Sequence, residues 1–294
     1  MSVLSPRRYC GRDFSPSELD HIRQLLELRP VLGRVALSRR ICQDLGWLNA
    51  LGQPKEMSCR VTLLRMEKDG LIALPAPLAK NGGGRCRFQL SAASEAGEPV
   101  PGPVGALEPL AFKRVDKGKL SSLWNELIQR YHYLGYQPLS GAQMRYLIWS
   151  RDGQLLAALG FGASAWHIKP RDDYIGWNPA QRAIGLHRIV NNARFLILPW
   201  VKCPGLASRI LSGIPKPLRA DWRWRYGYEP VLLETFVEIP SFSGGSYRAA
   251  NWVRVGHTCG RGKLEKNHRQ VAPLKDIWHY PLHSNFRQLL SAVP

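Results

Sequence analysis

The residues most able to do chemistry lie in the C-terminal half of the chain. Glu234 stands inside an apolar run, between two leucines and a Thr-Phe pair. A carboxylate in such a run must be paired, bound to a metal or protonated. Glu234 is therefore either a catalytic acid or base, or the ion-pair partner of an arginine such as Arg194. The sequence leaves both interpretations open.

Other polar residues could join Glu234 in one pocket. Tyr247 and Asn251 are spaced one helical turn apart, and His187 precedes a strand-like run. Asp221, the only acid in a strongly basic stretch, is the last of the catalytic candidates. Such a pocket would suit transfer to a base, or strand cleavage through Tyr247 or a metal-activated water. Structural hydrogen bonding is the alternative for Tyr247 and Asn251.

A metal, if present, would be held by carboxylates. The candidates are Asp173, beside an expected tight turn, together with Asp221 and Glu234. Neither a divalent metal nor an acyl-CoA-type cofactor follows from the residues alone, so the cofactor stays open.

A second group of residues suits nucleic acid. The stretch WRWRY at 222–226 alternates aromatic rings, which stack on bases, with arginines, which contact phosphates. The alternative is an amphipathic segment with Trp222 buried, Trp224 half-exposed and the arginines solvated. The C-terminal residues expected to bind DNA are Arg219, Trp222, Arg223, Trp224, Arg225, Arg261 and Lys263.

Composition agrees with a nucleic-acid partner. The 294 residues carry 41 Lys and Arg against 22 Asp and Glu, a net charge of +19, with 45% hydrophobic residues. Such a core-forming, basic chain favours a polyanion, with nucleic acid ahead of an anionic membrane surface. It has no apolar run of the roughly 18–20 residues that span a membrane. The N-terminus lacks the apolar core of a signal peptide, and the scattered cysteines argue against a zinc finger. We expect a cytoplasmic protein.

The charge is divided between two regions. Residues 91–112 hold four prolines, three glutamates and no basic residue, and are expected to form a linker or an extended crossing segment. Residues 1–90 carry 15 basic and 8 acidic side chains, and residues 113–294 carry 26 and 11. Both domains, 1–90 and 113–294, could therefore touch DNA.

The N-terminal region is predicted to contain three helices and a hairpin. The first helix starts at a Ser15 cap. The three helices span about 16–28, 38–45 and 58–69, the third with Val61, Leu64 and Met66 inward. Strand-like runs at 71–75 and 85–90 flank a glycine-rich tip. This order resembles a winged helix-turn-helix. The resemblance implies a DNA-binding domain that contacts DNA through Lys55, Arg60, Arg65, Lys68, Arg85 and Arg87. A helical domain with a solvated basic face, or a protein-docking winged helix, is the alternative.

The C-terminal region is predicted to form a mixed sheet. A helix at 120–133 precedes strands at 144–150, 154–164 and 193–201, a helix from about 206, and strands at 231–239 and 276–282. This order resembles the GNAT acetyltransferase fold. The resemblance implies a loop, KCPGLA at 202–207, that holds a cofactor pyrophosphate through Lys202, Gly205 and Ala207. Lys202 stands where that fold has Gln or Arg, and Pro204 removes one amide.

Six runs resemble the DruA family, named after the Druantia anti-phage system, whose members also occur beside or fused to insertion-sequence transposases. They are IGW (175–177), NNARFLILP (191–199), LASRILS (206–212), LLETFVE (232–238), YRAANW (247–252) and GHTCGRGK (256–263). The resemblance covers about residues 5–285 and implies a role in phage defence or mobile-element biology, but no known reaction.

The fold class expected is α+β: an N-terminal winged helix-turn-helix and a C-terminal GNAT-like mixed-sheet α/β domain. One functional hypothesis is a DNA-acting enzyme that modifies DNA or cleaves it with a metal. The other is a non-catalytic DNA-recognition subunit with a degenerate GNAT fold, which recruits a helicase, nuclease or transposase. The partner expected is double-stranded DNA at the winged helix, and single-stranded DNA or a flipped base at the C-terminal domain.

Overall fold

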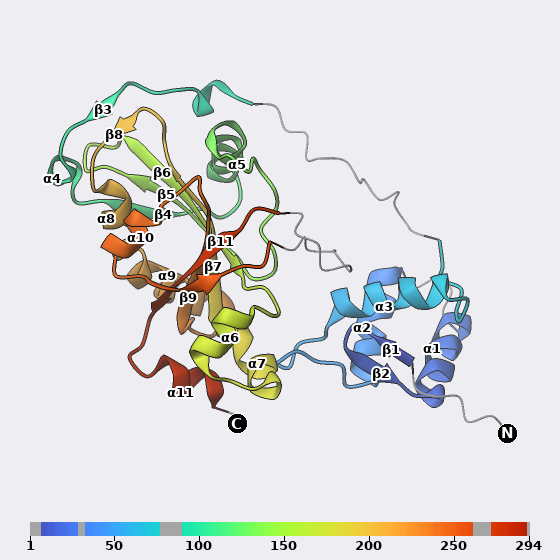
Figure 1. Cartoon of the computed structure of the whole chain (residues 1–294). Coiled ribbons are helices and arrows are strands. Elements are labelled where there is room, and N and C mark those ends of the chain that lie inside the picture. Colours follow the sequence, from blue (N-terminus) through green and yellow to red (C-terminus); the bar gives the residue numbers. More distant parts are fainter. Residues whose placement is uncertain (1–6, 29–32, 77–89, 261–271, 293–294) are drawn as a thin grey trace. The chain divides into compact units, whose positions relative to one another are not determined.

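The chain forms two compact units, residues 1–85 and 86–294 (Figure 1). The computed structural model describes residues 7–28, 33–76, 90–260 and 272–292. No helix in these ranges is long and apolar enough to cross a membrane.

Unit 1 is a small helical unit with a short hairpin. Its elements are β1 (Arg7–Tyr9), β2 (Arg12–Phe14), α1 (Pro16–Leu28), α2 (Arg34–Asp44) and α3 (Glu56–Lys68). The start of α1 has the expected cap, because Ser15 Oγ accepts from the Glu18 amide at 3.2 Å and Glu18 Oε2 accepts from the Ser15 amide at 2.9 Å. This reciprocal pair satisfies two backbone donors at the helix end.

The rotation of α3 about its axis differs from the prediction. Cys59, Leu63 and Met66 face the core, whereas Val61 and Leu64 are exposed. Met66 is inward as predicted. The prediction of Val61 and Leu64 as inward residues is wrong, since α3 carries apolar residues on more than one side and its pattern alone does not select a face. Residues 71–76 form no strand, so the first strand of the predicted wing is absent. The rest of the wing, with Arg85 and Arg87, lies outside the described residues.

Unit 2 contains a seven-stranded sheet and a separate two-stranded sheet of β3 and β8. The strands of this unit are β3 (Val100–Pro101), β4 (Ala111–Arg114), β5 (Met144–Trp149), β6 (Leu155–Ala163), β7 (Ile189–Ile197), β8 (Val201–Lys202), β9 (Leu232–Glu238), β10 (Val253–His257) and β11 (Lys275–Pro281). Its helices are η1 (Ala92–Ser94), α4 (Val104–Leu107), α5 (Lys119–Tyr131), α6 (Lys169–Ile175), α7 (Pro179–Gly185), η2 (Leu186–Arg188), α8 (Leu206–Gly213), α9 (Pro215–Tyr226), α10 (Gly245–Ala249) and α11 (Phe286–Ser291).

The order of the large sheet is β10-β11-β9-β7-β6-β5-β4. Neighbouring strands are antiparallel except for β7 and β9, which are parallel and pair only from Ile189–Asn191 to Leu232–Glu234. Beyond these residues β7 and β9 no longer pair with each other, although β7 continues to Ile197 beside β6 and β9 continues to Glu238 beside β11. The sheet therefore opens between β7 and β9.

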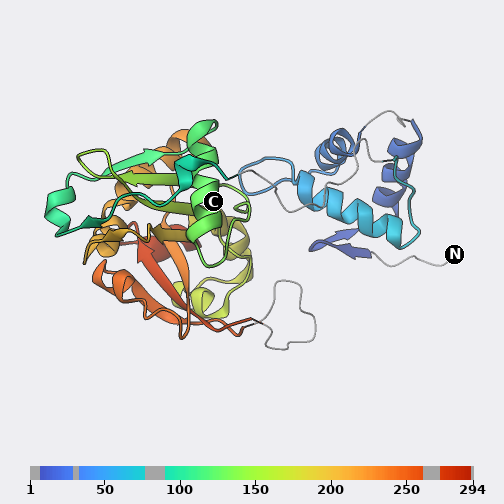
Figure 2. The same ribbon diagram turned by 90° about the horizontal axis from the view of Figure 1, so that it is seen from above.

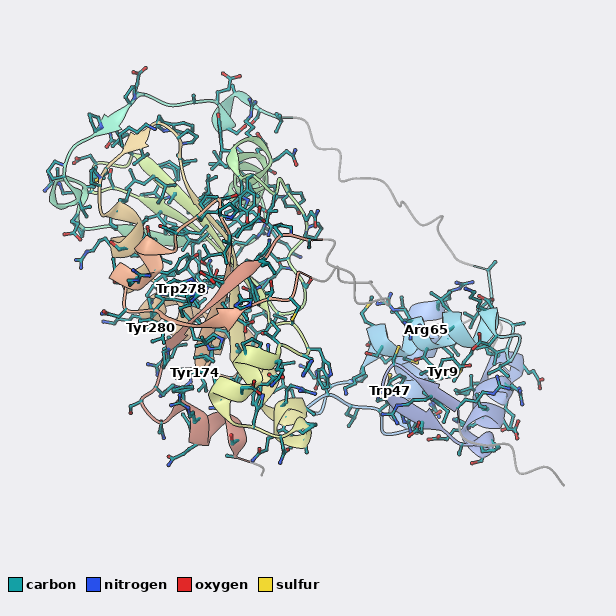
Figure 3. All side chains as sticks on the ribbon, in the orientation of Figure 1. Tyr9, Trp47, Arg65, Tyr174, Trp278 and Tyr280 are labelled. Atoms are coloured by element: carbon teal, nitrogen blue, oxygen red, sulfur yellow. The ribbon has the colours of Figure 1, made fainter. Side chains whose placement is uncertain are left out.

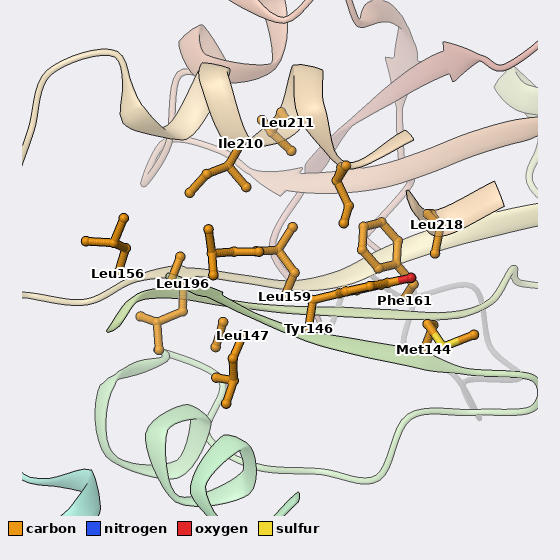
Figure 4. Packing of buried hydrophobic residues seen from close by; sticks show 14 of the residues in the cluster. Met144, Tyr146, Leu147, Leu156, Leu159, Phe161, Leu196, Ile210, Leu211 and Leu218 are labelled. Atoms are coloured by element: carbon orange, nitrogen blue, oxygen red, sulfur yellow. The ribbon is translucent and has the colours of Figure 1, made fainter. Parts of the chain in front are cut away.

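Helices cover both faces of this sheet. Figure 4 shows side chains of β5 and β6, among them Tyr146 and Phe161, packed toward Ile210 of α8 and Leu218 of α9, with α5 on the opposite face. In the view from above, α5 lies across the strands (Figure 2). Trp124 of α5 anchors that contact, because its indole donates to the Leu159 carbonyl at 2.9 Å.

The predicted linker at 91–112 belongs to unit 2. It contains η1, β3 and α4, and its Val100 and Leu107 side chains are buried in the core of this unit. Strand β3 pairs in parallel with β8, which holds the segment against residues 201–202. Although its composition is typical of a linker, this segment crosses one end of the sheet.

Candidate functional site

Glu234 lies in a row of aligned residues at the middle of the sheet. Gly162, Asn191, Glu234 and His279 are register partners across β6, β7, β9 and β11. Directly opposed residues in a sheet point to the same face. Glu234 and His279 are fully buried there, so this acid meets neighbours instead of solvent.

The partner of Glu234 is Arg171, not Arg194. The Arg171 guanidinium lies 3.6 Å from Glu234 Oε2, and both side chains are fully buried. Ser164 Oγ donates to Glu234 Oε1 at 2.6 Å, and His279 Nε2 lies 3.4 Å from Oε2. The buried carboxylate is thus balanced by one cation and a short hydrogen bond, as a buried charge requires.

Arg171 also ties helix α6 to the sheet. Its guanidinium donates to Ser164 Oγ and to the Ala165 carbonyl at 2.8 Å, and to Asp172 at 2.9 Å. Asp172 in turn accepts from Arg182 at 2.9 Å. Figure 3 labels Tyr174 of the same helix, whose ring centroid lies 5.3 Å from that of His279. These contacts join β9, α6 and α7 in one buried polar network.

Tyr247 belongs to a separate cluster on the other face. Its hydroxyl donates to Asn192 Oδ1 at 2.9 Å, and Thr235 Oγ1 donates to the Asn192 carbonyl at 3.0 Å. Because Thr235 follows Glu234 in a strand, their side chains point to opposite faces. Burial raises the pKa of Tyr247. The phenol is therefore held neutral and hydrogen-bonded.

The other catalytic candidates do not join either cluster. Asn251 is exposed, lies beyond the end of α10 and has a left-handed backbone with φ of 63°, so it does not share a helix face with Tyr247. His187 Nδ1 donates to the Ile184 carbonyl at 2.8 Å, and burial lowers its pKa. Asp221 accepts from Arg114 at 2.9 Å and from the Tyr146 hydroxyl at 2.8 Å.

The three metal-ligand candidates are also apart. Asp173 is exposed and pairs with Lys169 at 2.7 Å, while Asp221 and Glu234 have the partners given above. Across the described ranges there is no group of three His, Cys, Asp or Glu side chains arranged to hold a metal ion. These three carboxylates, which are candidates only for the case that a metal is present, thus belong to three separate ion pairs in α6, α9 and β9.

The predicted cofactor loop lies beside β3 and α4. Lys202 lies in β8, which pairs with β3, and Ala207 lies in the first turn of α8. Gly205 precedes α8 with φ of 82°, and a Cβ at this position would lie 3.7 Å from a Val104 methyl group. A phosphate cradle needs free amides and an open approach. Lys202 and Gly205 are exposed, and 3.7 Å is ordinary van der Waals contact, so Val104 packs beside the loop without filling it. One departure from a phosphate cradle is Pro204, which has no amide hydrogen to donate.

Helix α9 separates the two tryptophans of the WRWRY stretch. Trp222 is 1% exposed and Trp224 is 71% exposed. Two residues apart on a helix means about 200° of rotation, so the side chains point in nearly opposite directions. Trp222 packs in the core and is removed from the expected DNA contacts. Arg114 stacks on the Trp224 ring, with its Cζ 4.1 Å from the centroid, which holds the exposed ring in place.

Trp224 stands between two hollows lined by basic side chains. The hollows have volumes of about 770 and 630 Å³, and Trp224 lines both. Their basic residues are Lys216, Arg219 and Arg223 on one side and Lys117, Arg145 and Arg225 on the other. We name these six residues and Trp224 the Trp224 surface. Two carboxylates, Glu229 and Asp116, also line the hollows and pair with Arg219, Arg223 and Arg225.

The sequence missed three members of the Trp224 surface. Lys216 is one turn from Arg219 on α9, so a helical reading of this stretch could have found it. Lys117 and Arg145 come from segments distant in sequence and had no local signal.

The predicted DNA contacts of unit 1 are only partly described. Lys55, Arg65 and Lys68 are exposed and Arg60 is half-buried, all on or next to α3 (Arg65 is labelled in Figure 3). Among the ion pairs between described residues, none uses Lys55, Arg65 or Lys68. Arg261 and Lys263 lie outside the described residues.

Comparison with known families identifies one family that matches this chain. Residues 65–270 match the model of a family described as Druantia protein DruA. No curated protein matches the chain. The predicted α+β class is confirmed: the N-terminal unit is mainly helical, and the C-terminal unit has a large mixed sheet with helices on both faces.

Similar solved structures are acetyltransferases. A chimera of spermidine N-acetyltransferase SpeG from Vibrio cholerae and hSSAT is 15% identical, with a TM-score of 0.36, over 59% of this chain and 95% of that chain. The Vibrio cholerae enzyme in complex with CoA and spermine is 13% identical, with the same score and coverage. Nourseothricin acetyltransferase is 11% identical, with a TM-score of 0.28, over 48% of this chain and 66% of that chain.

Proposed function

Since this chain belongs to the DruA family, we propose that it serves phage defence as a DNA-binding protein and that the Trp224 surface holds the DNA. One observation carries this proposal: a tryptophan that is 71% exposed lies between two hollows lined by six basic side chains. An exposed aromatic ring offers a stacking platform to a base, and cations on both sides can follow the phosphates.

A recognition role fits the candidate residues better than a catalytic one. Glu234 is balanced by Arg171, Tyr247 lies on the opposite face of the sheet, and Asp221 is bound by Arg114 and Tyr146. Each of these polar groups has an ion-pair or hydrogen-bond partner within the protein, so a structural role is enough to explain its position. Chemistry on the DNA would then come from a partner protein, such as a helicase, nuclease or transposase.

Replacing Trp224 with Ala should weaken binding of a fluorescent single-stranded oligonucleotide by about 5- to 100-fold, the loss expected for one stacked base. Fluorescence anisotropy at two salt concentrations measures this affinity. Trp166→Ala is the matched control, because Trp166 is also exposed, at 59%, and lies beneath an arginine, Arg182. Equal affinities for wild type and Trp224→Ala would contradict the proposal.

We propose that α3 of unit 1 makes a second contact, to duplex DNA. Replacing Arg65 with Ala should weaken duplex binding several-fold and lower the slope of log affinity against log salt by about 0.9, the change expected for one lost phosphate contact. Arg23→Ala on α1 is the control, because Arg23 is exposed and already paired with Asp20 at 2.8 Å. An unchanged salt slope in Arg65→Ala would remove α3 from the DNA interface.

A further inference from the structure

The opening between β7 and β9 contains a pocket that the DNA-binding proposal does not use. Its volume is about 860 Å³, within the range of small-molecule sites. Residues of both diverging strands line it, together with the end of α5 on one side and residues leading into α10 on the other. The pocket exists because the parallel pairing stops at Asn191 and Glu234.

Arg194 gives this pocket an unbalanced positive charge. Within the described residues it has no carboxylate partner, and its one hydrogen bond is from Nη1 to the Ala193 carbonyl at 2.7 Å. Its Nε atom is buried without a hydrogen-bond partner. A buried donor left unpaired in a protein is costly, and a charged one more so. An anion bound in the pocket would satisfy it.

The positive charge of Arg194 contributes to the lowered pKa of the neighbouring His132. Burial lowers the pKa of His132 to about 4, and the charges of Arg194 and Lys275 add to that decrease. Lys275 is paired with Glu238 at 3.2 Å. Of these two cations, Arg194 is therefore the one without a carboxylate partner among the described residues, and it can pair with an anionic ligand.

Aromatic rings and a free amide oxygen complete the lining. Tyr133 and Phe242 are 52% and 48% exposed, and their ring centroids are 5.3 Å apart. Asn191 lines the pocket, and its Oδ1 is buried without a donor. Flat rings suit a base, and an amide oxygen accepts from an exocyclic amino group.

From these contacts we propose that the pocket binds a phosphorylated nucleoside, with its phosphate at Arg194 and its base against Tyr133 and Phe242. Two sources carry this chemistry: a free nucleotide and the terminal nucleotide of a DNA strand. The proposal goes beyond DNA binding at the Trp224 surface and does not depend on it.

Calorimetric titration tests the proposal on the full chain with AMP and adenosine, and on the full chain carrying Trp224→Ala with a short oligonucleotide with and without a 5′-phosphate, so that binding at the Trp224 surface is weakened. We expect AMP or the phosphorylated oligonucleotide to bind, and Arg194→Met to weaken this binding by about 10- to 100-fold, as expected for a charge-assisted hydrogen bond. Binding of AMP identifies a free nucleotide as the source; binding of the phosphorylated oligonucleotide alone identifies a strand end.

Two variants keep this test decisive. Arg188→Met is the matched control, because Arg188 is also a half-buried arginine that donates to a carbonyl, that of Leu289, and it lies outside the pocket. Tyr133→Ala, at a half-exposed position, should weaken binding about 5-fold or more if the base stacks there. The proposal is overturned if neither phosphorylated compound binds at 1 mM, if adenosine binds as well as AMP, or if Arg194→Met leaves the affinity unchanged. Trp224→Ala should bind AMP normally, so failure of either proposal is separable from failure of the other.

Discussion

Replacing Arg171 with Met is expected to lower the free energy of unfolding of unit 2 by about 3–5 kcal/mol. The change leaves Glu234 buried without its cation, in a site where both side chains have no exposed surface. It also removes the hydrogen bonds from Arg171 to Ser164, Ala165 and Asp172. Loss of one member of a buried pair is costly because the remaining charge is not solvated.

Denaturation in urea, followed by tryptophan fluorescence, measures this effect. Nine of the ten tryptophans lie in residues 86–294, so the signal reports mainly on unit 2. Lys169→Met is the control, because Lys169 forms an exposed pair with Asp173 on the same helix and should change stability by less than about 1 kcal/mol. Adding Glu234→Gln to Arg171→Met should restore part of the loss, since the unpaired charge is removed. Equal stabilities of the Arg171→Met and Lys169→Met variants would contradict a structural role for this pair.

Replacing Trp222 with Ala is expected to cost about 3–5 kcal/mol of stability, the range for a large aromatic side chain removed from a core. Trp222 is 1% exposed, and its ring packs against Tyr226 with centroids 5.0 Å apart. Trp224→Ala should change stability by no more than about 0.5 kcal/mol, since the side chain is 71% exposed. The same urea titration compares the two variants.

The two tryptophans thus provide a reciprocal test. Trp222→Ala should lose stability and keep its DNA affinity while it remains folded, whereas Trp224→Ala should keep its stability and lose DNA affinity. Similar losses of stability in both variants would show that α9 is not oriented as described. A drop in DNA affinity in folded Trp222→Ala equal to that of Trp224→Ala would argue against stacking at one exposed ring.

Much of the architecture could be predicted from local sequence signals. The strands predicted at 144–150, 154–164, 231–239 and 276–282 correspond to β5, β6, β9 and β11 within one or two residues. The Ser15 cap and the helix after it are also as predicted. These features depend on apolar periodicity, turn residues and caps, which act between residues close in sequence.

Residue patterns did not predict which side of a segment is buried when apolar side chains occur on several of its sides. Val61, Leu64 and Met66 were expected inward, and α3 buries Met66 as expected but Cys59 and Leu63 in place of Val61 and Leu64. For the stretch at 222–226 the sequence left two interpretations open, and the structure agrees with the amphipathic one for Trp222, which is buried, while Trp224 is more exposed than that interpretation expected. The proline-rich segment at 91–112 was expected to be a linker or an extended crossing segment, and in the structure it buries Val100 and Leu107 in unit 2.

Only the folded structure could show which residues are the partners of the buried and exposed charged side chains. Sequence indicated that Glu234 needed a partner and suggested Arg194, but α6 brings Arg171 to it and leaves Arg194 lining an open pocket. Lys117 and Arg145 join Trp224 from segments about 80 to 110 residues away in the chain. Local periodicity selects helices and strands because their hydrogen bonds and side-chain contacts recur over a few residues. The pairing of basic with acidic side chains depends on how those elements pack against one another. Many pairings of the 41 basic with the 22 acidic residues are compatible with the same local sequence pattern.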